Sequence, residues 1–242
     1  MVAGPRFAIY FVPAAGTALY RFGAAVLGYD CYTGESVARL RDVGPTEAEW
    51  ASLTAEPRTY GFHATLKAPF RLRDEFDHDD LLAAVKTLAA SISPIPTLEP
   101  AVELIGGFVA IVPRTASPAL DRLAVDCVTA FERFRLPMTA QERDRRMAAG
   151  LSPHQAANLD RWGYPYVFEE FRFHMTLTRR IGPDRRLAIH TLLQNEFARR
   201  CGHGPIRLDR LALARQDRPD TPFRVIGHAT VSRAAKRPTI PG

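Results

Sequence analysis

Two short motifs of the same residue types, far apart in the chain, could carry out acid–base chemistry. Phe62-His63-Ala64-Thr65-Leu66 and Phe173-His174-Met175-Thr176-Leu177 both read Phe-His-x-Thr-Leu. Each is rich in β-forming residues and is followed by proline or glycine, which predicts two strands. Side chains alternate along a strand, so each histidine shares a face with its threonine and the apolar residues face the other way. If the strands are neighbours, two imidazoles and two hydroxyls meet in one site.

Such a pair of imidazoles suits general acid–base catalysis at neutral pH, because one ring can take a proton while the other gives one. The hydroxyls can donate hydrogen bonds to the non-bridging oxygens of a phosphate. This arrangement fits the attack of water on a phosphodiester and requires no metal or cofactor. The candidate catalytic residues are therefore His63, His174, Thr65 and Thr176.

Other side chains are candidates for contact with a substrate. Lys67 lies four residues after His63, so regular alternation predicts that it shares the histidine's face. Three tyrosines near the predicted strands complete the substrate-binding set: Tyr10, Tyr60 and Tyr164. The alternative for each residue is packing in the sheet or a place at the surface.

The histidine motifs have competing interpretations. Two buried histidines satisfied by their neighbours would give the same pattern without any chemistry. Gly227-His228-Ala229-Thr230-Val231 also contains His-x-Thr, but it has no apolar residue before the histidine and no helix after it. We interpret His228 as a structural strand residue. A zinc site built on His63, His174 and the aspartates of residues 77–80 lacks suitable ligand spacing.

The hydrophobic pattern predicts the elements that position the motifs. Polar, glycine-dotted residues 28–44 predict a loop and the proline-rich residues 93–100 a linker, whereas Asp77 is an expected helix N-cap. Strands are expected over 7–12, 62–72, around His174, and over 102–105, 108–112, 206–214 and 223–232, and helices over 17–27, 45–53, 77–92, 117–134, 140–149, 153–162 and 183–200.

The order of these elements occurs twice. Phe108-Val109-Ala110-Ile111-Val112-Pro113 resembles the segment from Phe7 to Pro13, and each is followed by a helix and a His-x-Thr strand. We expect internal repeats at about 7–105 and 108–232 within a single domain, residues 1–242. The predicted fold is α+β, a two-lobed duplicated α/β unit with antiparallel-rich sheets around a central cleft.

Composition narrows the partners and the compartment. A formal charge of +6, supplied mostly by arginine, favours anionic partners. The three cysteines are widely spaced and form no C-x-x-C, which favours a reducing compartment. No apolar run reaches the roughly 18 residues of a membrane span. Residues 7–15 superficially resemble a signal peptide, but the similar segment in mid-chain favours a structural role. We expect a cytoplasmic protein with a small phosphorylated substrate and no membrane partner.

At the two motifs the chain resembles the 2H phosphoesterase superfamily, whose signature is a pair of apolar-His-x-Thr/Ser-apolar motifs in a duplicated α+β fold. The resemblance implies that His63 and His174 are the acid–base pair and that Thr65 and Thr176 hold the phosphate. The segment from Tyr60 to Phe70 and the overall length look like a bacterial subfamily of unknown activity found near phosphonate-utilisation genes.

The sequence therefore predicts a metal-independent hydrolase that opens a cyclic phosphodiester, such as a sugar or nucleotide cyclic phosphate linked to phosphonate metabolism. One rival is an RNA-end-processing enzyme with the same four residues, which the scattered arginines favour less than an arginine–aromatic tract would. The other rival is a phosphate-ligand binding protein without catalysis.

Overall fold

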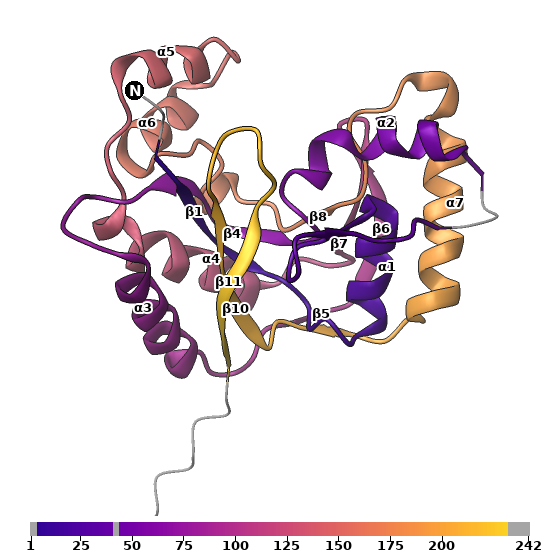
Figure 1. Ribbon diagram of the computed structural model, residues 1–242, viewed down its shortest axis with the longest axis horizontal. Helices are drawn as coiled ribbons and strands as arrows, with labels where there is room; N and C mark the ends of the chain where they lie inside the picture. Colours follow the sequence, from indigo (N-terminus) through magenta and orange to yellow (C-terminus); the bar gives the residue numbers. More distant parts are fainter. Residues whose placement is uncertain (1–3, 41–43, 232–242) are drawn as a thin grey trace, which may run out of the picture.

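A seven-stranded sheet, antiparallel throughout, runs through the molecule in the order β11-β10-β1-β4-β8-β7-β6 (Figure 1). The computed structural model describes residues 4–40 and 44–231. The strands of this sheet are β1 (Arg6–Phe11), β4 (Ala64–Arg71), β6 (Pro100–Ile105), β7 (Phe108–Pro113), β8 (Met175–Thr176), β10 (Arg210–Gln216) and β11 (Arg224–Thr230). Two small sheets pair β2 (Tyr29–Asp30) with β3 (Glu35–Ser36) and β5 (Thr97–Leu98) with β9 (Ile206–Arg207).

Two groups of helices flank the large sheet on opposite sides of the view in Figure 1. One group, α3 (His78–Ser91) and α4 (Pro118–Ala130), contacts β4, β10 and β11. The other, α1 (Ala18–Leu27), α2 (Glu47–Arg58) and α7 (Pro183–Cys201), packs together, and α7 contacts β6 and β7. The chain is thus a mixed α/β protein built on a large antiparallel sheet.

An insertion between α4 and β8 forms a separate corner, at the upper left of Figure 1. It contains α5 (Ala140–Met147) and α6 (Pro153–Trp162), which contact each other, and it continues into a short 3₁₀ turn, η2 (Phe168–Glu170). Both helices begin with a capping box, in which a Thr or Ser side chain and the residue three positions later satisfy each other's backbone N–H groups.

Local sequence signals predicted most elements well. The Asp77 side chain accepts hydrogen bonds from the backbone N–H groups of Asp79 and Asp80, so the predicted N-cap is confirmed. The expected helix over 117–134 ends earlier, at Ala130, and is followed by the 3₁₀ turn η1 (Glu132–Phe134). The predicted loop over 28–44 contains the β2–β3 hairpin, and the helix expected at 45–53 extends from 47 to 58. The predicted end of the last strand, Ser232, lies outside the described residues.

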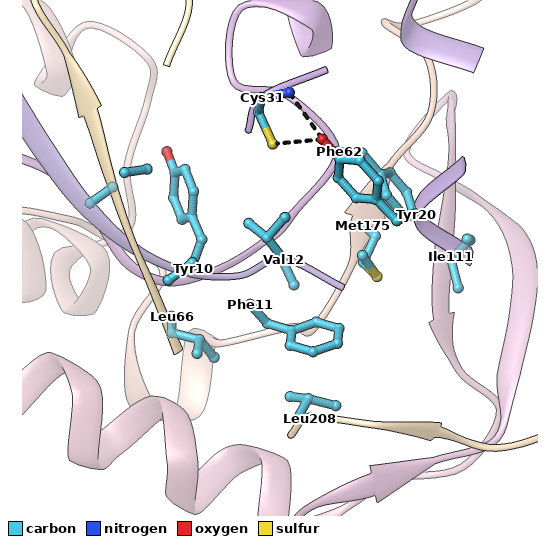
Figure 2. Close-up of a cluster of buried hydrophobic side chains, with 14 of the residues drawn as sticks. Tyr10, Phe11, Val12, Tyr20, Cys31, Phe62, Leu66, Ile111, Met175 and Leu208 are labelled. Carbon is cyan, nitrogen blue, oxygen red and sulfur yellow. Dashed lines mark hydrogen bonds between the residues drawn. The ribbon is translucent and has the colours of Figure 1, made fainter. Parts of the chain in front are cut away.

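A row of buried side chains crosses the middle of the sheet. Phe11 pairs with Ala64, Ala64 with Met175, and Met175 with Ile111, and all four are almost completely buried. Figure 2 shows Phe11, Met175 and Ile111 in this core, with Phe62 nearby. The Phe62 ring lies so close to α1 that a Cβ atom on Gly23 would sit 2.1 Å from it. Because Gly23 has no side chain, the Phe62 ring packs directly on the backbone of α1, and this contact fixes the residue before His63.

Strand β4 is irregular, and this changes the face on which its side chains lie. Tyr10 of β1 pairs with Thr65, but the preceding residue, Ile9, pairs with Lys67, so β4 carries an extra residue at this point. Cross-strand partners point to the same face and neighbours along β1 point to opposite faces, so Thr65 and Lys67 lie on opposite faces. The prediction that Lys67 shares a face with His63 is therefore wrong.

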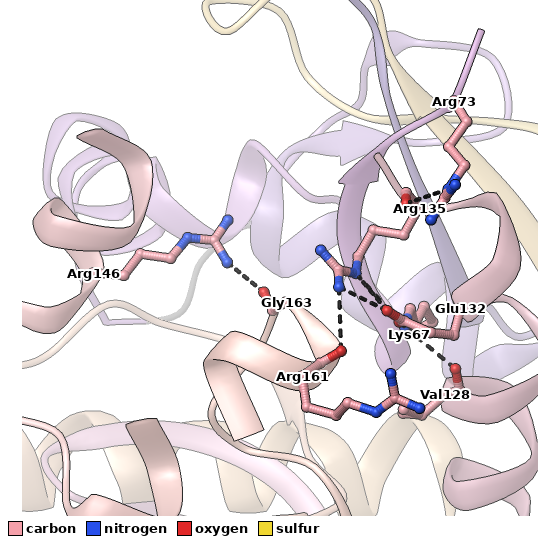
Figure 3. A network of polar contacts seen from close by, with 8 residues as sticks. All are labelled: Lys67, Arg73, Val128, Glu132, Arg135, Arg146, Arg161 and Gly163. Atoms are coloured by element: carbon pink, nitrogen blue, oxygen red, sulfur yellow. Dashed lines mark hydrogen bonds and ion pairs between the residues drawn. The ribbon is translucent and has the colours of Figure 1, made fainter. Parts of the chain in front are cut away.

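Lys67 instead forms a buried ion pair on the side of the sheet that α4 covers (Figure 3). Its Nζ lies 2.6 Å from Glu132 Oε2 and also donates to the Val128 carbonyl. Arg135 donates to the same carboxylate. Burial lowers the pKa of Lys67, and the Glu132 carboxylate opposes that shift. This group joins β4 to the end of α4, so its role is structural.

No helix in the described ranges has the length and apolar character needed to cross a membrane. The three cysteines, Cys31, Cys127 and Cys201, are free thiols.

The geometry of the Lys67–Glu132 ion pair predicts that replacing Glu132 and replacing Lys67 lower the free energy of unfolding by unequal amounts. Glu132→Gln leaves Lys67 buried without an anion and should lower the free energy of unfolding by about 3 kcal/mol. Lys67→Met leaves Glu132 paired with Arg135 and should cost about 1 kcal/mol or less. Urea denaturation of both variants and of the double variant measures the difference. Equal costs for the two single variants would contradict a buried pair centred on Glu132.

Candidate active site

The pairing of β4 with β8 brings the two histidine motifs together. Ala64, the middle residue of the first motif, is opposite Met175, the middle residue of the second. In an antiparallel pair this register places His63 opposite Thr176 and Thr65 opposite His174. Because Ala64 and Met175 point into the core, the flanking histidines and threonines point to the other face. The expected meeting of the two motifs on adjacent strands is confirmed.

Each imidazole is held in the same way by its own motif. His63 Nδ1 lies 2.9 Å from the carbonyl oxygen of Gly61, and His174 Nδ1 lies 2.7 Å from that of Arg172. A carbonyl oxygen can only accept, so Nδ1 carries the proton in both rings. In the neutral form, Nε2 of both histidines is then the nitrogen free to accept a proton.

His63 is held in the neutral state. Burial, with a smaller contribution from the charge of His174, lowers its pKa to about 4, although the hydrogen bond to Gly61 opposes the shift. Its Nε2 lies 3.1 Å from Thr65 Oγ1, which donates to this unprotonated nitrogen. The ring also packs against Tyr10, with 3.9 Å between ring centroids. Near pH 7 His63 is therefore a neutral, oriented base.

A cavity of about 450 Å³ opens over the two motifs, within the size range of small-molecule sites. All four predicted catalytic residues line it, together with the three predicted tyrosines. The remaining lining residues are Glu56, Pro57, Gly61, Ala68, Pro69, Phe108, Thr178, Arg179 and Arg180. The structure thus gathers every candidate site residue of the sequence except Lys67.

The tyrosines form one wall of this cavity. Tyr10 is there because it pairs with Thr65 in the neighbouring strand and so shares its face. Its hydroxyl is buried and has no hydrogen-bond partner within the described part of the chain. Burial raises the pKa of Tyr10 well above its ordinary value and, together with Tyr166 and Tyr60, raises that of Tyr164 to about 12. These hydroxyls are therefore donors at neutral pH.

Two arginines that sequence reasoning did not select lie on another wall. Arg179 and Arg180 follow the second motif, in a stretch where β8 has already ended. Strand alternation cannot predict the direction of side chains beyond the strand, which explains why Arg179 was missed. The only available signal was the Arg-Arg pair directly after a motif that could bind phosphate.

The remaining histidines do not join the site. His228 is exposed on the edge strand β11, in agreement with a structural role for the third His-x-Thr copy. His190 Nε2 contacts the Val102 carbonyl. Among residues 4–40 and 44–231, no group of three or more histidine, cysteine, aspartate or glutamate side chains is arranged to hold a metal ion.

A family model described as "Protein of unknown function (DUF1045)" matches residues 65–224. The chain is 35% identical over 239 residues to a protein of Janthinobacterium sp. (strain Marseille) named ribose 1,5-bisphosphate phosphokinase PhnN. A protein of Laribacter hongkongensis (strain HLHK9) with the same name is 32% identical over 177 residues. These matches cover 98% and 73% of this chain but 53% and 40% of the relatives. The chain thus spans about half the length of the curated relatives it matches.

Two solved structures are similar to the chain at a low level. One is described as "Crystal structure of phosphoesterase", with a TM-score of 0.42, 13% identity and coverage of 96% of this chain and 100% of that one. The other is the conserved protein of unknown function ATU0111 from Agrobacterium tumefaciens str. C58, with a TM-score of 0.41, 11% identity and coverage of 95% and 87%. Likeness at this level supports no conclusion about activity.

The hydrogen bond from His63 Nδ1 to the Gly61 carbonyl oxygen indicates that this glycine positions the His63 ring. Its φ of +73° disfavours other residues, and an added Cβ would lie 2.6 Å from Cys31 Cβ. Gly61→Ala should therefore destabilise the fold by about 1–3 kcal/mol and shift the signal of the His63 Nδ1 proton in NMR spectra. Gly150→Ala is the control, because Gly150 has a φ of +76° but open space around it. An unchanged His63 signal in Gly61→Ala would contradict this positioning role.

The lowered pKa of His63 predicts a pH-dependent stability. Between pH 6.5 and about 4 the unfolded chain binds a proton at this residue and the folded chain does not, so the free energy of unfolding falls as the pH falls. The contribution is about 3 kcal/mol at most. Urea denaturation from pH 4 to 8 should show that His63→Asn loses this slope, whereas His228→Asn keeps it. Parallel curves for wild type and His63→Asn would contradict the prediction.

Proposed function

This chain belongs to the family described as "Protein of unknown function (DUF1045)", and we propose that it is a metal-independent phosphodiesterase that hydrolyses a cyclic phosphodiester. The observation that carries the proposal is the pair of histidines on one face of the sheet, each with Nδ1 bound to a backbone carbonyl and each beside a threonine at the cavity. This arrangement presents two similar nitrogens and two hydroxyl donors to one substrate.

The proposed roles of the histidines differ. His63 is neutral near pH 7, so its Nε2 takes a proton from the attacking water. As the new bond from water oxygen to phosphorus forms, the bond to one ester oxygen breaks. His174 in its protonated form donates from Nε2 to that leaving oxygen, while its Nδ1 remains bound to the Arg172 carbonyl. Exchange with solvent then restores both rings.

The other lining residues would stabilise the phosphate. Thr176 is placed to donate to its non-bridging oxygens, and in the proposed complex the Thr65 hydroxyl turns from His63 Nε2 to the phosphate, which leaves Nε2 to the attacking water. The protonated tyrosines Tyr10 and Tyr164 add donors on one side. Tyr60 packs its ring parallel to Phe223, at 5.5 Å between centroids, and so offers a flat apolar face for a sugar or base. Lys67 is not part of this proposal because it is committed to Glu132.

The names of the relatives bear on the substrate. They describe a kinase for a phosphorylated ribose, which fits a sugar cyclic phosphate connected with phosphonate metabolism as the substrate of this chain. A kinase activity in the matched half is the competing proposal. The chain contains no G-x-x-x-x-G-K-[ST] loop, and none of its three lysines follows a glycine. We therefore propose hydrolysis, and not phosphoryl transfer from a nucleotide, for this chain.

The duplicated two-lobed architecture is also part of the proposal, as a single domain with repeats at about 7–105 and 108–232. The order of strands supports it: β1 lies beside β4 as β7 lies beside β8, and β10 and β6 follow on the outside. We further propose a cytoplasmic enzyme acting on a small phosphorylated molecule, with RNA ends as the second candidate substrate and a non-catalytic phosphate-binding protein as the third possibility.

Phosphorus NMR of the EDTA-treated protein with nucleoside 2′,3′-cyclic phosphates and ribose cyclic phosphates tests the activity. Turnover should be retained after EDTA treatment and should fall by about a thousandfold or more in both His63→Asn and His174→Asn. Lys67→Met should keep the wild-type rate, because its side chain does not reach the cavity.

Three other results would redirect the proposal. Loss of turnover with EDTA would contradict metal independence. Turnover restricted to RNA oligonucleotides, with a rate that depends strongly on salt concentration, would favour an RNA-end-processing enzyme. Binding of cyclic phosphates without turnover would favour a binding protein.

A further inference from the structure

The cavity has two chemically different arms. The histidine pair lies at the centre of the sheet, on β4 and β8. Tyr10 lies on the β1 side; Tyr60 packs on the same Phe223 ring as Tyr10, and Tyr60 and Tyr164 are both close enough to affect the pKa of Tyr10. Phe108, at the start of β7, and the arginines after β8 lie on the opposite side. A substrate centred on the histidines therefore meets tyrosines at one end and guanidinium groups at the other.

Arg179 is held in place by contacts with α2. Its Nε donates to the Ser52 carbonyl oxygen at 2.8 Å, and its Nη2 donates to Ser52 Oγ at 2.9 Å. Its backbone N–H also donates to Leu53 O, so both ends of the residue are attached to α2. None of these partners carries a charge, and the guanidinium keeps its full positive charge at the cavity.

Arg180 lies beside it and has no carboxylate within ion-pair distance among the described residues. An added Cβ on Gly106 would be 3.9 Å from its Nη2, which places the guanidinium near the β6–β7 turn. Among the described residues that line the cavity, Glu56 is the one acidic side chain, and it forms no ion pair with either arginine. The charged lining of this arm is thus net positive.

The face of the sheet that carries the two histidines also differs between its β1 side and its β7 side. Tyr10 pairs with Thr65 on one side of the histidines, whereas Ala110 pairs with Thr176 on the other. Paired residues share a face, so the Tyr10 ring lies beside Thr65, whereas Ala110 presents only a methyl group beside Thr176. The Phe108 ring, two residues before Ala110 and so on the same face, lies 5.9 Å from the His174 ring between centroids. The two sides therefore differ in chemistry, with tyrosine hydroxyls on the β1 side and an apolar ring with guanidinium groups on the other.

We propose that Arg179 and Arg180 form a second anion subsite, so that the preferred substrate is a phosphodiester that carries a further phosphate group on the arm away from the tyrosines. This inference rests on the proposed function for the phosphodiester at the histidines, but the subsite itself can be observed separately. Arginine suits the role, because its planar fork binds phosphate oxygens in pairs.

Titration with inorganic phosphate, followed by NMR of arginine Nε–H and histidine ring signals, separates the two sites. The Arg179 and Arg180 signals should shift with phosphate in wild type and in His63→Asn. In Arg180→Gln the Arg179 response should weaken by about tenfold in midpoint concentration, as expected for loss of a charged hydrogen bond. Arg207, which is exposed on β9 and is not among the residues that line the cavity, is the matched control for non-specific binding. An equal response of Arg207 and Arg180, or no response of Arg179 and Arg180, overturns the subsite.

Turnover of adenosine 2′,3′-cyclic phosphate with and without a 5′-phosphate tests the selectivity. Wild type should favour the 5′-phosphorylated compound in kcat/KM by about tenfold, and Arg180→Gln should lose this preference through KM while Arg207→Gln keeps it. Equal rates for the two compounds in wild type contradict selection of a second phosphate. If neither compound is hydrolysed, the proposed function fails for these esters, and the phosphate titration alone decides the subsite.

Discussion

The position of Ala64 opposite Met175 is the constraint on which the site depends. Strand β8 has two residues, so a slip of one position would turn His174 and Thr176 into the core and expose Met175. The register is secured on both sides, because Met175 also pairs with Ile111 and Ala64 with Phe11. Burial of this row across the sheet fixes two short polar motifs, from distant parts of the chain, on one face.

A second level of order comes from backbone groups outside the strands. Residues Gly61 and Arg172 each turn a carbonyl oxygen toward the Nδ1 atom of the following motif. Gly61 can do so because it adopts a positive φ against Cys31. Cys31 is itself held by the Tyr20 hydroxyl, which accepts from the Cys31 backbone N–H (Figure 2) and also donates to Asp30. The tautomer of His63 thus depends on Gly61, and the packing of Cys31 against Gly61 leaves no space for a side chain at this position.

Charge is distributed unevenly between the two faces of the sheet. On the side that α4 covers, Lys67 and Arg135 share the carboxylate of Glu132 in a partly buried network (Figure 3). On the cavity side, neutral His63 and protonated tyrosines accompany two arginines and a single glutamate. Lys67 and the two cavity arginines, Arg179 and Arg180, therefore have separate roles. Arg179 and Arg180 form no ion pair within the described ranges, so their guanidinium groups are the ones that can bind a phosphate.

The sequence alone determined the residue types of the site, the strand character of both motifs and most helices, because these follow from period-two and helical patterns and from caps such as Asp77. It also indicated Tyr10, Tyr60 and Tyr164. Only the tertiary structure decided the place of Lys67 and Arg179. An extra residue in β4 reverses the alternation before Lys67, and β8 ends before Arg179, so neither follows the strand period. Irregularities of this kind depend on pairing with distant strands and leave no mark in local sequence.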